Sequence, residues 1–287
     1  MVIPHDELEP DMTINAPGLH EIDQPVAVSA ELKTRYQRDG YVKIAQALSP
    51  DVLGHFGERI TDATLRLNTE QRPLDERDTY DRAFLQVMNL WREDQAARQF
   101  VFGKRLASIA AELLGVKAVR LYHDQSLYKE AGGGLTPAHA DQFYWPLASE
   151  RTVTAWIPLQ AVPQSMGPLG FYKGSHKVDF GRDLEISDES EARITQAMES
   201  RGFEFDVEAF ALGDVSFHAG WTFHRAGANS SGQARSVMTM IYMDADIRVA
   251  EPVNTPQRAD LERWLPGLKP GDLAASPLNP IVYSDPA

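Results

Sequence analysis

The residues of this sequence that are best suited to bind a metal ion begin with a His-x-Asp pair, His139 and Asp141. On a β-strand, residues i and i+2 project from the same face, so both side chains can reach one ion. The chain contains no cysteine, so a thiolate site is excluded and any metal must be bound by His, Asp or Glu. A His-x-Asp pair alone supports a metal site only weakly, because such short patterns occur by chance.

A further ligand is expected from the segment GDVSFHAGWTFHRAGANSSGQAR, which contains His218, His224 and Arg235. Residues 227–232 are typical of a turn, and strand-like apolar residues flank them on both sides. A chain reversal within this turn predicts a hairpin in which His224 faces Arg235, with Cβ atoms about 5 Å apart. His224 is therefore the expected ligand, and His218 is its rival, although its hairpin partner would be Ile241 rather than a cation.

Two histidines and one carboxylate on one face of an octahedral ion leave three positions open, an arrangement that non-haem iron(II) oxygenases use. Two of these positions would accept the keto oxygen and the C1 carboxylate of 2-oxoglutarate, and the third would accept O₂. The distal carboxylate of this co-substrate needs a cation in a sheltered pocket. Arg235 is suited to that role, because a guanidinium stays charged and can donate two parallel hydrogen bonds to a carboxylate.

Composition and charge exclude several other classes of function. The 287 residues, 43% hydrophobic and 24% charged, are typical of a globular protein with one large core. The net charge of −13 argues against a nucleic-acid partner, because such binding depends on clusters of Lys and Arg. No apolar run is long enough to span a membrane, and the N-terminus lacks the features of a signal peptide. We therefore expect a cytoplasmic protein without a membrane partner.

The candidate ligands lie in a β-rich region in the middle of the chain. From Lys117 to Asp246, short runs of β-branched and aromatic residues alternate with clusters of Gly, Pro and Asn, which predicts many short strands with long connections. This pattern favours a jelly roll, so the expected fold class is mainly β with flanking α-helices. We expect a flexible N-terminal arm at 1–28 and a single domain at 29–287. That domain would comprise a helical part, a β-barrel core and a C-terminal extension, with bounds at 29–116, 117–246 and 247–287.

Helical patterns flank the β-rich region. They occur at 29–40, 49–67, 83–94, 96–115 and 255–267. Gly115 is typical of a helix end, and the last helix is expected to pack outside the sheets. In the segment 83–94, Gln86 and Asn89 are candidate substrate contacts. The acidic segment 183–196 is expected to be either a solvated helical or loop insertion or a mobile flap over a substrate pocket.

The ordered set of His139-x-Asp141, TAWIPLQAV, GPLGFYKGSHK and GDVSFHAGWTFHRAGANSSGQAR resembles the phytanoyl-CoA dioxygenase (PhyH-like) family of Fe(II)/2-oxoglutarate-dependent oxygenases. The resemblance covers roughly residues 30–246. It implies a double-stranded β-helix, the cupin-like jelly roll, in which the distal histidine comes late in the barrel. It also implies a co-substrate arginine eleven residues after that histidine, which is the spacing of His224 and Arg235.

The resemblance implies further contacts to 2-oxoglutarate. Trp156 lies where the family has a tryptophan beside the co-substrate. Gln125 and Leu127 occupy alternate positions of the strand before the His-x-Asp pair, and Thr136 lies just ahead of the ligands. Many members have Ser two residues after the distal histidine, where this sequence has Ala226. The corresponding hydroxyl contact is therefore missing or comes from Thr136 or Gln125.

The activity implied by the resemblance is oxidation of an aliphatic C–H bond of a small molecule, most simply hydroxylation. It would use Fe(II) and O₂, and 2-oxoglutarate would be converted to succinate and CO₂. The family's substrates include natural-product intermediates. Two alternatives stay open: a non-catalytic or 2-oxoglutarate-independent cupin-type metal- or ligand-binding barrel, and a cupin-type metal-dependent hydrolase or isomerase. Neither alternative gives Arg235 a task.

Overall fold

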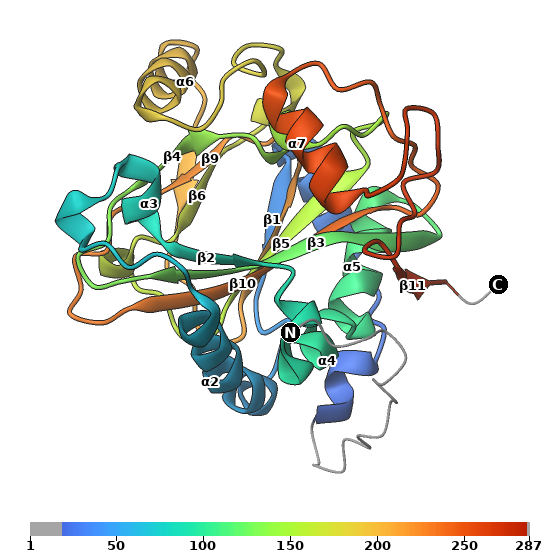
Figure 1. Cartoon of the computed structure of the whole chain (residues 1–287), viewed down its shortest axis with the longest axis horizontal. Coiled ribbons are helices and arrows are strands. Elements are labelled where there is room, and N and C mark those ends of the chain that lie inside the picture. Colours follow the sequence, from blue (N-terminus) through green and yellow to red (C-terminus); the bar gives the residue numbers. More distant parts are fainter. Residues whose placement is uncertain (1–18, 286–287) are drawn as a thin grey trace.

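Two antiparallel β-sheets face each other and carry helices on their outer sides (Figure 1). The computed structural model describes residues 19–285 of the chain. The larger sheet contains, in spatial order, β1 (Tyr41–Ile44), β8 (Val215–Ala219), β5 (Thr152–Pro158), β10 (Arg235–Asp244), β3 (Ala118–Lys129) and β11 (Ile281–Ser284), and β2 (Leu85–Met88) also pairs with β3. The smaller sheet contains β4 (Thr136–His139), β9 (His224–Ala226), β6 (Leu169–Tyr172) and β7 (Phe205–Val207). This arrangement confirms the predicted double-stranded β-helix.

The central strands of the larger sheet are covered on both faces. All ten residues of β10 and all seven residues of β5 are buried. One face packs against helices and the other faces the smaller sheet. A strand buried on both faces has apolar residues at nearly every position, which explains the run SVMTMIYM in β10.

Four N-terminal helices pack beside the larger sheet, and Figure 1 shows α2 and α4 below it. They are α1 (Ala30–Asp39), α2 (Pro50–Leu67), α4 (Gln95–Val101) and α5 (Lys104–Leu114). The hydroxyls of Ser29 and Ser49 accept hydrogen bonds from backbone N–H groups in the first turns of α1 and α2, so both helices begin where the sequence predicts. Gly115 adopts the left-handed conformation that ends α5. Buried side chains of these helices, such as Phe56 of α2, form the main core with the outer face of the sheet.

The segment 83–94 does not form the helix that its apolar pattern predicts. Its first half forms β2, which pairs with β3, and Leu90–Arg92 forms a short 3₁₀-helix. Asn89 separates the two with a φ of 49°, a left-handed conformation that interrupts any continuous helix. A short apolar run fits a strand as well as a helix, and here the side of β3 facing away from β10 provides the backbone partners that favour a strand.

Residues 19–28 pack against the core, so the prediction of a loosely packed arm is wrong for this part of the chain. Leu19 and Ile22 belong to a short 3₁₀-helix, and both are buried in the main hydrophobic cluster. The sequence shows no helical or strand period here, because the segment contributes isolated apolar side chains rather than one continuous face. The rest of the predicted arm, residues 1–18, lies outside the described residues.

The C-terminal extension, residues 247–287, joins the fold at two places. The helix α7 (Thr255–Trp264) lies outside the sheets, as the sequence predicts, and Gln257 Nε2 donates a hydrogen bond of 3.1 Å to the carbonyl of Phe143. The strand β11 pairs with the outer part of β3, which the sequence did not indicate. The extension is therefore part of the barrel's outer wall.

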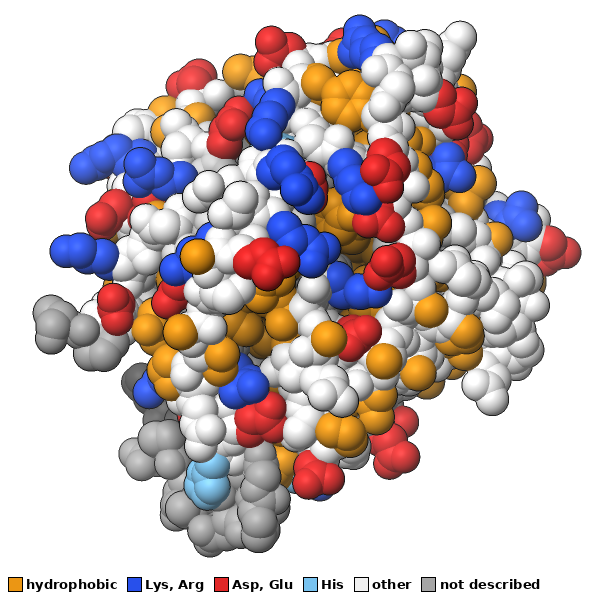
Figure 2. Space-filling model, turned by 180° about the vertical axis from the view of Figure 1, so that it is seen from behind, with side chains coloured by type: hydrophobic (Ala, Val, Ile, Leu, Met, Phe, Trp, Pro, Cys, Tyr) orange, Lys and Arg blue, Asp and Glu red, His pale blue; other side chains and the backbone are white. Residues whose placement is uncertain are grey.

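The surface seen from behind carries charges of both signs. Figure 2 shows Lys and Arg side chains interspersed with Asp and Glu across this face, so neither sign forms an uninterrupted field there. Within residues 19–285, no helix has the length and apolarity needed to cross a membrane.

Candidate active site

His139, Asp141 and His224 lie together between the two sheets. His139 ends β4 and is the cross-strand partner of His224 in β9. Asp141 begins a 3₁₀-helix, Asp141–Tyr144, and Ala140 before it is still extended, so Asp141 keeps the strand's orientation. The potential ligand atoms of the three side chains all lie within 4.8 Å of one another. Among residues 19–285 this is the group of His and acidic residues whose atoms fit a single metal ion.

Both histidines present the same nitrogen to the centre of this group. Nδ1 of His139 bonds to the carbonyl of Pro137 at 2.7 Å, and Nδ1 of His224 bonds to the carbonyl of Thr222 at 2.9 Å. A carbonyl only accepts, so each Nδ1 carries the proton and each Nε2 has a free lone pair. Burial lowers the pKa of both imidazoles to about 4, which keeps them neutral and able to bind a metal.

Asp141 is oriented by two further side chains. Its Oδ1 lies 3.6 Å from Nε2 of both His139 and His224, while Oδ2 accepts hydrogen bonds from Thr154 Oγ1 at 2.8 Å and His218 Nε2 at 3.1 Å. Burial raises the pKa of Asp141, whereas the hydrogen bond from His218 lowers it, and the net pKa lies well below its usual range. The carboxylate therefore stays charged. His218, the rival ligand, lies behind Asp141 and is bonded to it.

The predicted hairpin between His224 and Arg235 is wrong. His224 lies in β9 of the smaller sheet and faces His139, whereas Arg235 begins β10 in the larger sheet and faces Lys129. The intervening residues cross from one sheet to the other. Asn229 fixes this crossing, because its side-chain amide donates hydrogen bonds to the carbonyls of Glu130 at the end of β3 and of Gln233 just before β10. Turn-forming residues do not distinguish a hairpin from a connection between facing sheets.

The structure nevertheless brings all predicted site residues into one cavity. The cavity has a volume of about 460 Å³ and lies between the sheets. Its lining includes the eight residues singled out from the sequence: His139, Asp141, His224, Arg235, Trp156, Gln125, Leu127 and Thr136. Facing sheets, rather than a shared hairpin, place His224 and Arg235 in the same space.

Arg235 is a buried cation whose charge is not matched by an acidic side chain. Its side chain is 1% exposed, Nη1 donates to the carbonyl of Gly167, and Nε has no partner among the described residues. The guanidinium lies 5.4 Å from the centre of the Trp156 ring, and burial lowers its pKa to about 9. The hydroxyl of Thr136, which lines the same cavity, is also buried without a partner. Unsatisfied donors of this kind fit a bound carboxylate.

Lys129, the strand partner of Arg235, does not supply a second strong charge. It is fully buried and its ammonium donates to the carbonyl of Gly134. Burial, together with the nearby charge of Arg235, lowers the pKa of Lys129 to about 6. At neutral pH Arg235 is therefore the principal cation at this end of β3 and β10.

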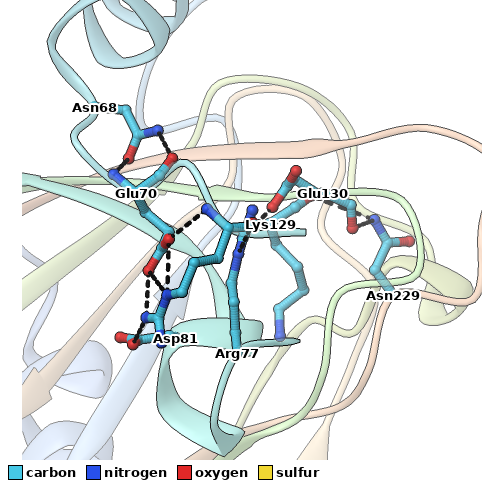
Figure 3. A network of polar contacts seen from close by, with 8 residues as sticks. Asn68, Glu70, Arg77, Asp81, Lys129, Glu130 and Asn229 are labelled. Carbon is cyan, nitrogen blue, oxygen red and sulfur yellow. Dashed lines mark hydrogen bonds and ion pairs between the residues drawn. The ribbon is translucent and has the colours of Figure 1, made fainter. Parts of the chain in front are cut away.

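A polar network fixes this end of β3 (Figure 3). The chain between α2 and the short helix α3 (Thr79–Ala83) reaches across to it, where Arg77 forms an ion pair with Glu130. Asn229 meets Glu130 from the other side, since its amide donates a hydrogen bond of 3.1 Å to the Glu130 carbonyl. Two segments that are distant in the sequence therefore hold the end of β3, where Lys129 pairs with Arg235 at the start of β10.

The acidic segment 183–196 is mostly helical, as the expectation of a helical insertion allows, with an exposed acidic face and a buried face that packs on the barrel. Most of it belongs to α6 (Asp188–Ser200), which packs over β4 and β9 and buries Ile194. Glu191 accepts a hydrogen bond of 2.7 Å from the backbone N–H of Ala138 and forms an ion pair with Arg225. Ala138 immediately precedes His139, and Arg225 immediately follows His224. Glu191 thus connects the two strands that carry the histidines.

Several cavity residues were missed in the sequence. They are Tyr80, Phe84, Tyr144, Trp145, Glu185, Ile186, His123 and Asp260. Most come from loops, α3 and α7, for which the sequence gives no spatial relation to the barrel. His123 could have been predicted to line the cavity, because it continues the alternation of Gln125 and Leu127 along β3. Gln86 also lines the cavity and donates to Gln125 at 2.9 Å, whereas Asn89 is buried and bonds to Trp91 instead.

A double-stranded β-helix that carries a His-x-Asp pair and a distal histidine around one metal position defines the class of Fe(II)/2-oxoglutarate-dependent oxygenases. Within this class, the profile of the phytanoyl-CoA dioxygenase (PhyH) family matches residues 36–237, and the chain belongs to that family. No curated protein sequence matches this chain.

Among the solved structures of similar fold, two come from nogalamycin biosynthesis. SnoK, a non-haem α-ketoglutarate-dependent carbocyclase from nogalamycin biosynthesis, is 27% identical with a TM-score of 0.73, over 91% of this chain and 100% of SnoK. SnoN, an epimerase from the same biosynthesis, is 26% identical with a TM-score of 0.69, over 88% of this chain and 97% of SnoN. EctD from S. alaskensis is 16% identical with a TM-score of 0.63, over 82% of this chain and 84% of EctD, and supports the fold alone.

The first prediction distinguishes the distal ligand from its neighbour. We expect the anaerobic protein to bind one Fe(II) per chain and His224→Ala to lose measurable binding, because a direct ligand is removed. His218→Gln, which keeps a donor toward Asp141, should weaken Fe(II) by about tenfold or less. Calorimetric titration under nitrogen measures both, with folding checked by circular dichroism. Tighter iron binding by His224→Ala than by His218→Gln would reverse the assignment.

The second prediction concerns Glu191 as the link between the ligand strands. Glu191→Ala removes the hydrogen bond to Ala138 and the ion pair with Arg225, so we expect Fe(II) affinity to fall by roughly tenfold. The matched control is Glu189→Ala on the exposed side of the same helix, which removes an ion pair with Arg193 that is remote from the strands. Equal iron affinity in the two variants would show that α6 does not support the ligands.

Proposed function

We propose that this protein oxidises an aliphatic C–H bond of a small-molecule substrate, most simply by hydroxylation, and converts 2-oxoglutarate to succinate and CO₂. The observation that carries this proposal is the buried guanidinium of Arg235, which has no acidic partner among the described residues and lies in the cavity that also contains His139, Asp141 and His224. A metal-binding barrel with another activity would have no use for a buried cation beside its metal. Burying such a charge without a partner is unfavourable, so its retention fits a site for an anion.

The chain's residues have separable tasks in this reaction. His139, Asp141 and His224 would hold iron(II), which when bound supplies the oxidising chemistry with O₂. Arg235 binds the distal carboxylate of 2-oxoglutarate through its free Nε and its Nη groups, and Thr136 supplies a hydroxyl donor. Thr136 would thereby provide the hydroxyl contact to 2-oxoglutarate that Ala226, which has no hydroxyl group, cannot provide.

Apolar residues around Arg235 exclude water from the co-substrate end. Leu127, Trp156, Leu169 and Ala226 belong to one buried cluster that also lines the cavity. In such a low-dielectric environment a charge-assisted hydrogen bond is stronger than in water. The same residues limit the approach of water to the reacting centre, which protects a reactive intermediate from side reactions.

Gln125 lies in the same transverse row of the larger sheet as Trp156, and its task is to position the polar side chains of that part of the cavity wall. In β10, Thr239 is the cross-strand partner of both Gln125 and Trp156, so the three side chains form one transverse row. Gln86 in β2 donates to Gln125 and in turn accepts from the hydroxyl of Tyr80 at 3.3 Å. This chain of hydrogen bonds holds the polar wall opposite the metal position and connects it to α3.

The substrate class we propose is a natural-product intermediate. Support comes from SnoK and SnoN, both of which are described as α-ketoglutarate-dependent and belong to the biosynthesis of one natural product. Their described activities, ring closure and epimerisation, can begin with the same removal of hydrogen as hydroxylation. The competing interpretation, a barrel without turnover, predicts that no succinate forms from 2-oxoglutarate under any condition.

The third prediction is that the Fe(II)-loaded protein releases succinate from 2-oxoglutarate in the presence of O₂. Release should be slow without substrate and faster when a substrate is present. It should require His139 and His224, because their replacement removes the metal. Quantifying succinate in a screen of small natural products measures this. A barrel that binds Fe(II) and 2-oxoglutarate but never forms succinate would contradict the proposed activity.

The fourth prediction tests the co-substrate task of Arg235. A charged contact to a carboxylate in a sheltered pocket is typically worth about 2–5 kcal/mol on truncation, so Arg235→Ala should weaken 2-oxoglutarate by roughly 30-fold or more. Arg235→Lys should recover part of the loss, because an ammonium keeps the charge but not the planar fork. Iron affinity should change little, since Arg235 is not a ligand.

Anaerobic titration with 2-oxoglutarate measures the effect of both Arg235 variants. Arg248→Ala serves as the control, because Arg248 is exposed and bonds to the carbonyl of Gly271 outside the cavity. If Arg235→Ala bound 2-oxoglutarate within about threefold of the parent, the co-substrate assignment would fail.

A further inference from the structure

The cavity extends beyond the metal and co-substrate positions to a second end with aromatic walls. Tyr80 comes from α3, Tyr144 is the last residue of the 3₁₀-helix Asp141–Tyr144, and Trp145 follows that helix. The hydroxyl of Tyr144 accepts a hydrogen bond of 3.0 Å from the backbone N–H of Ile186, which fixes that ring. Rigid aromatic rings of this kind provide flat apolar contact area for a substrate.

The carboxylate of Asp260, in α7, lies among these aromatic residues and is bonded to Tyr122 of β3. The β3–β10 pairing is irregular at Tyr122, which has no cross-strand partner there: Ile241 pairs with His123 and Tyr242 with Leu121. The hydroxyl of Tyr122 donates to Asp260 Oδ2 of α7 at 3.0 Å. Such irregularities often redirect side chains beside active sites.

His123 gives an independent sign of a ligand at this end. It lines the cavity, is 2% exposed, and its Nδ1 has no hydrogen-bond partner among the described residues. Burial lowers its pKa to about 3, so the ring is neutral. A buried ring nitrogen without a partner is costly unless a bound group satisfies it.

The charges at this end are acidic. With Asp141 assigned to the metal and Arg235 to 2-oxoglutarate, the remaining charged residues in the described lining are Glu185 and Asp260. Arg263 is close enough to lower the pKa of Asp260, but it is exposed and lies over the outer ring of Trp264. Burial prevails over that effect and raises the pKa of Asp260 to about 7, as expected for a carboxylate without a buried cation.

We propose that the substrate carries a protonated amine that binds to Asp260, while its flat apolar part lies between the aromatic walls. This inference rests on the proposed function, because it assumes that Arg235 is occupied by 2-oxoglutarate. His123 contributes a second polar contact beside the amine. A carboxylate or phosphate at the same position would meet Asp260 and Glu185, while Arg235 is the cation in the described cavity lining and Arg263 lies at the exposed surface, so acidic compounds are disfavoured. Tyr and Trp faces also attract a cation.

The test uses three probes with the same ring system and different charge: tryptamine, tryptophol and indoleacetate. Binding is measured by calorimetry under nitrogen to the Fe(II)-loaded protein with saturating 2-oxoglutarate, which keeps the acidic probe away from Arg235. We expect tryptamine to bind at least about tenfold more tightly than indoleacetate, with tryptophol between them. This comparison needs no variant, so it is independent of any effect of mutation on folding.

Asp260→Asn then tests the residue itself, because an amide can still accept from Tyr122 but carries no charge. Tryptamine should bind roughly tenfold more weakly and tryptophol within about twofold of the parent. Glu262→Gln is the matched control: it removes the same charge from an exposed position of α7 and should change neither affinity.

Three outcomes would overturn the inference: indoleacetate binding as tightly as tryptamine, an unchanged tryptamine affinity in Asp260→Asn, or no binding of tryptamine. A failure of 2-oxoglutarate to bind the Fe(II)-loaded protein in the same experiment would instead overturn the proposed function.

Discussion

The pairing of β4 with β9 is the contact on which the metal position depends. Both strands are short, and β4 is the edge strand of the smaller sheet, so few backbone hydrogen bonds hold His139 opposite His224. Edge strands expose unpaired backbone groups and are easily displaced. Here the side chains of α6 bind the outer edge of β4: Ser190 donates to the carbonyl of Ala138 at 2.8 Å, and Glu191 accepts from its N–H. The helix stabilises the edge that the small sheet leaves open.

A second constraint is the separation of unlike charges within one cavity. Asp141 is ionised and accepts hydrogen bonds from His218 and Thr154, whereas Arg235 lies beside the apolar cluster that contains Trp156. Direct contact between the two would neutralise both and leave neither a metal ligand nor an anion site. The rigid larger sheet maintains the distance, because both Thr154, which bonds to Asp141, and Arg235 project from its central strands.

Local features of the sequence were sufficient to predict much of the fold and the site. Helix ends at Ser29, Ser49 and Gly115 follow from side-chain caps and a left-handed glycine, which depend on neighbouring residues alone. The His-x-Asp pair and the spacing of His224 from Arg235 likewise identified the residues that meet in the cavity. The prediction failed where a distant partner decides the structure: within 83–94, residues Leu85–Met88 form a strand because they pair with β3.

The prediction of a hairpin between His224 and Arg235 was wrong for the same reason, because a distant contact decides the path of the chain. The residues after His224 have turn chemistry, but whether the chain returns in the same sheet or crosses to the facing one depends on contacts such as those of Asn229 with the end of β3. Asp260 is a further example. It is 119 positions from Asp141 in the printed sequence, and nothing in the pattern of α7 relates it to the barrel.

The position of α7 has a consequence for how enzymes with this barrel diversify. The helix follows β10 in the chain, lies outside the sheets, and still contributes Asp260 to the cavity lining. Insertions, deletions or recombination after β10 can therefore replace this wall without altering the register of β4 with β9 or the place of Arg235. Selection can act on substrate choice through a segment that carries none of the three metal ligands, so new specificities can arise while the older iron chemistry is inherited.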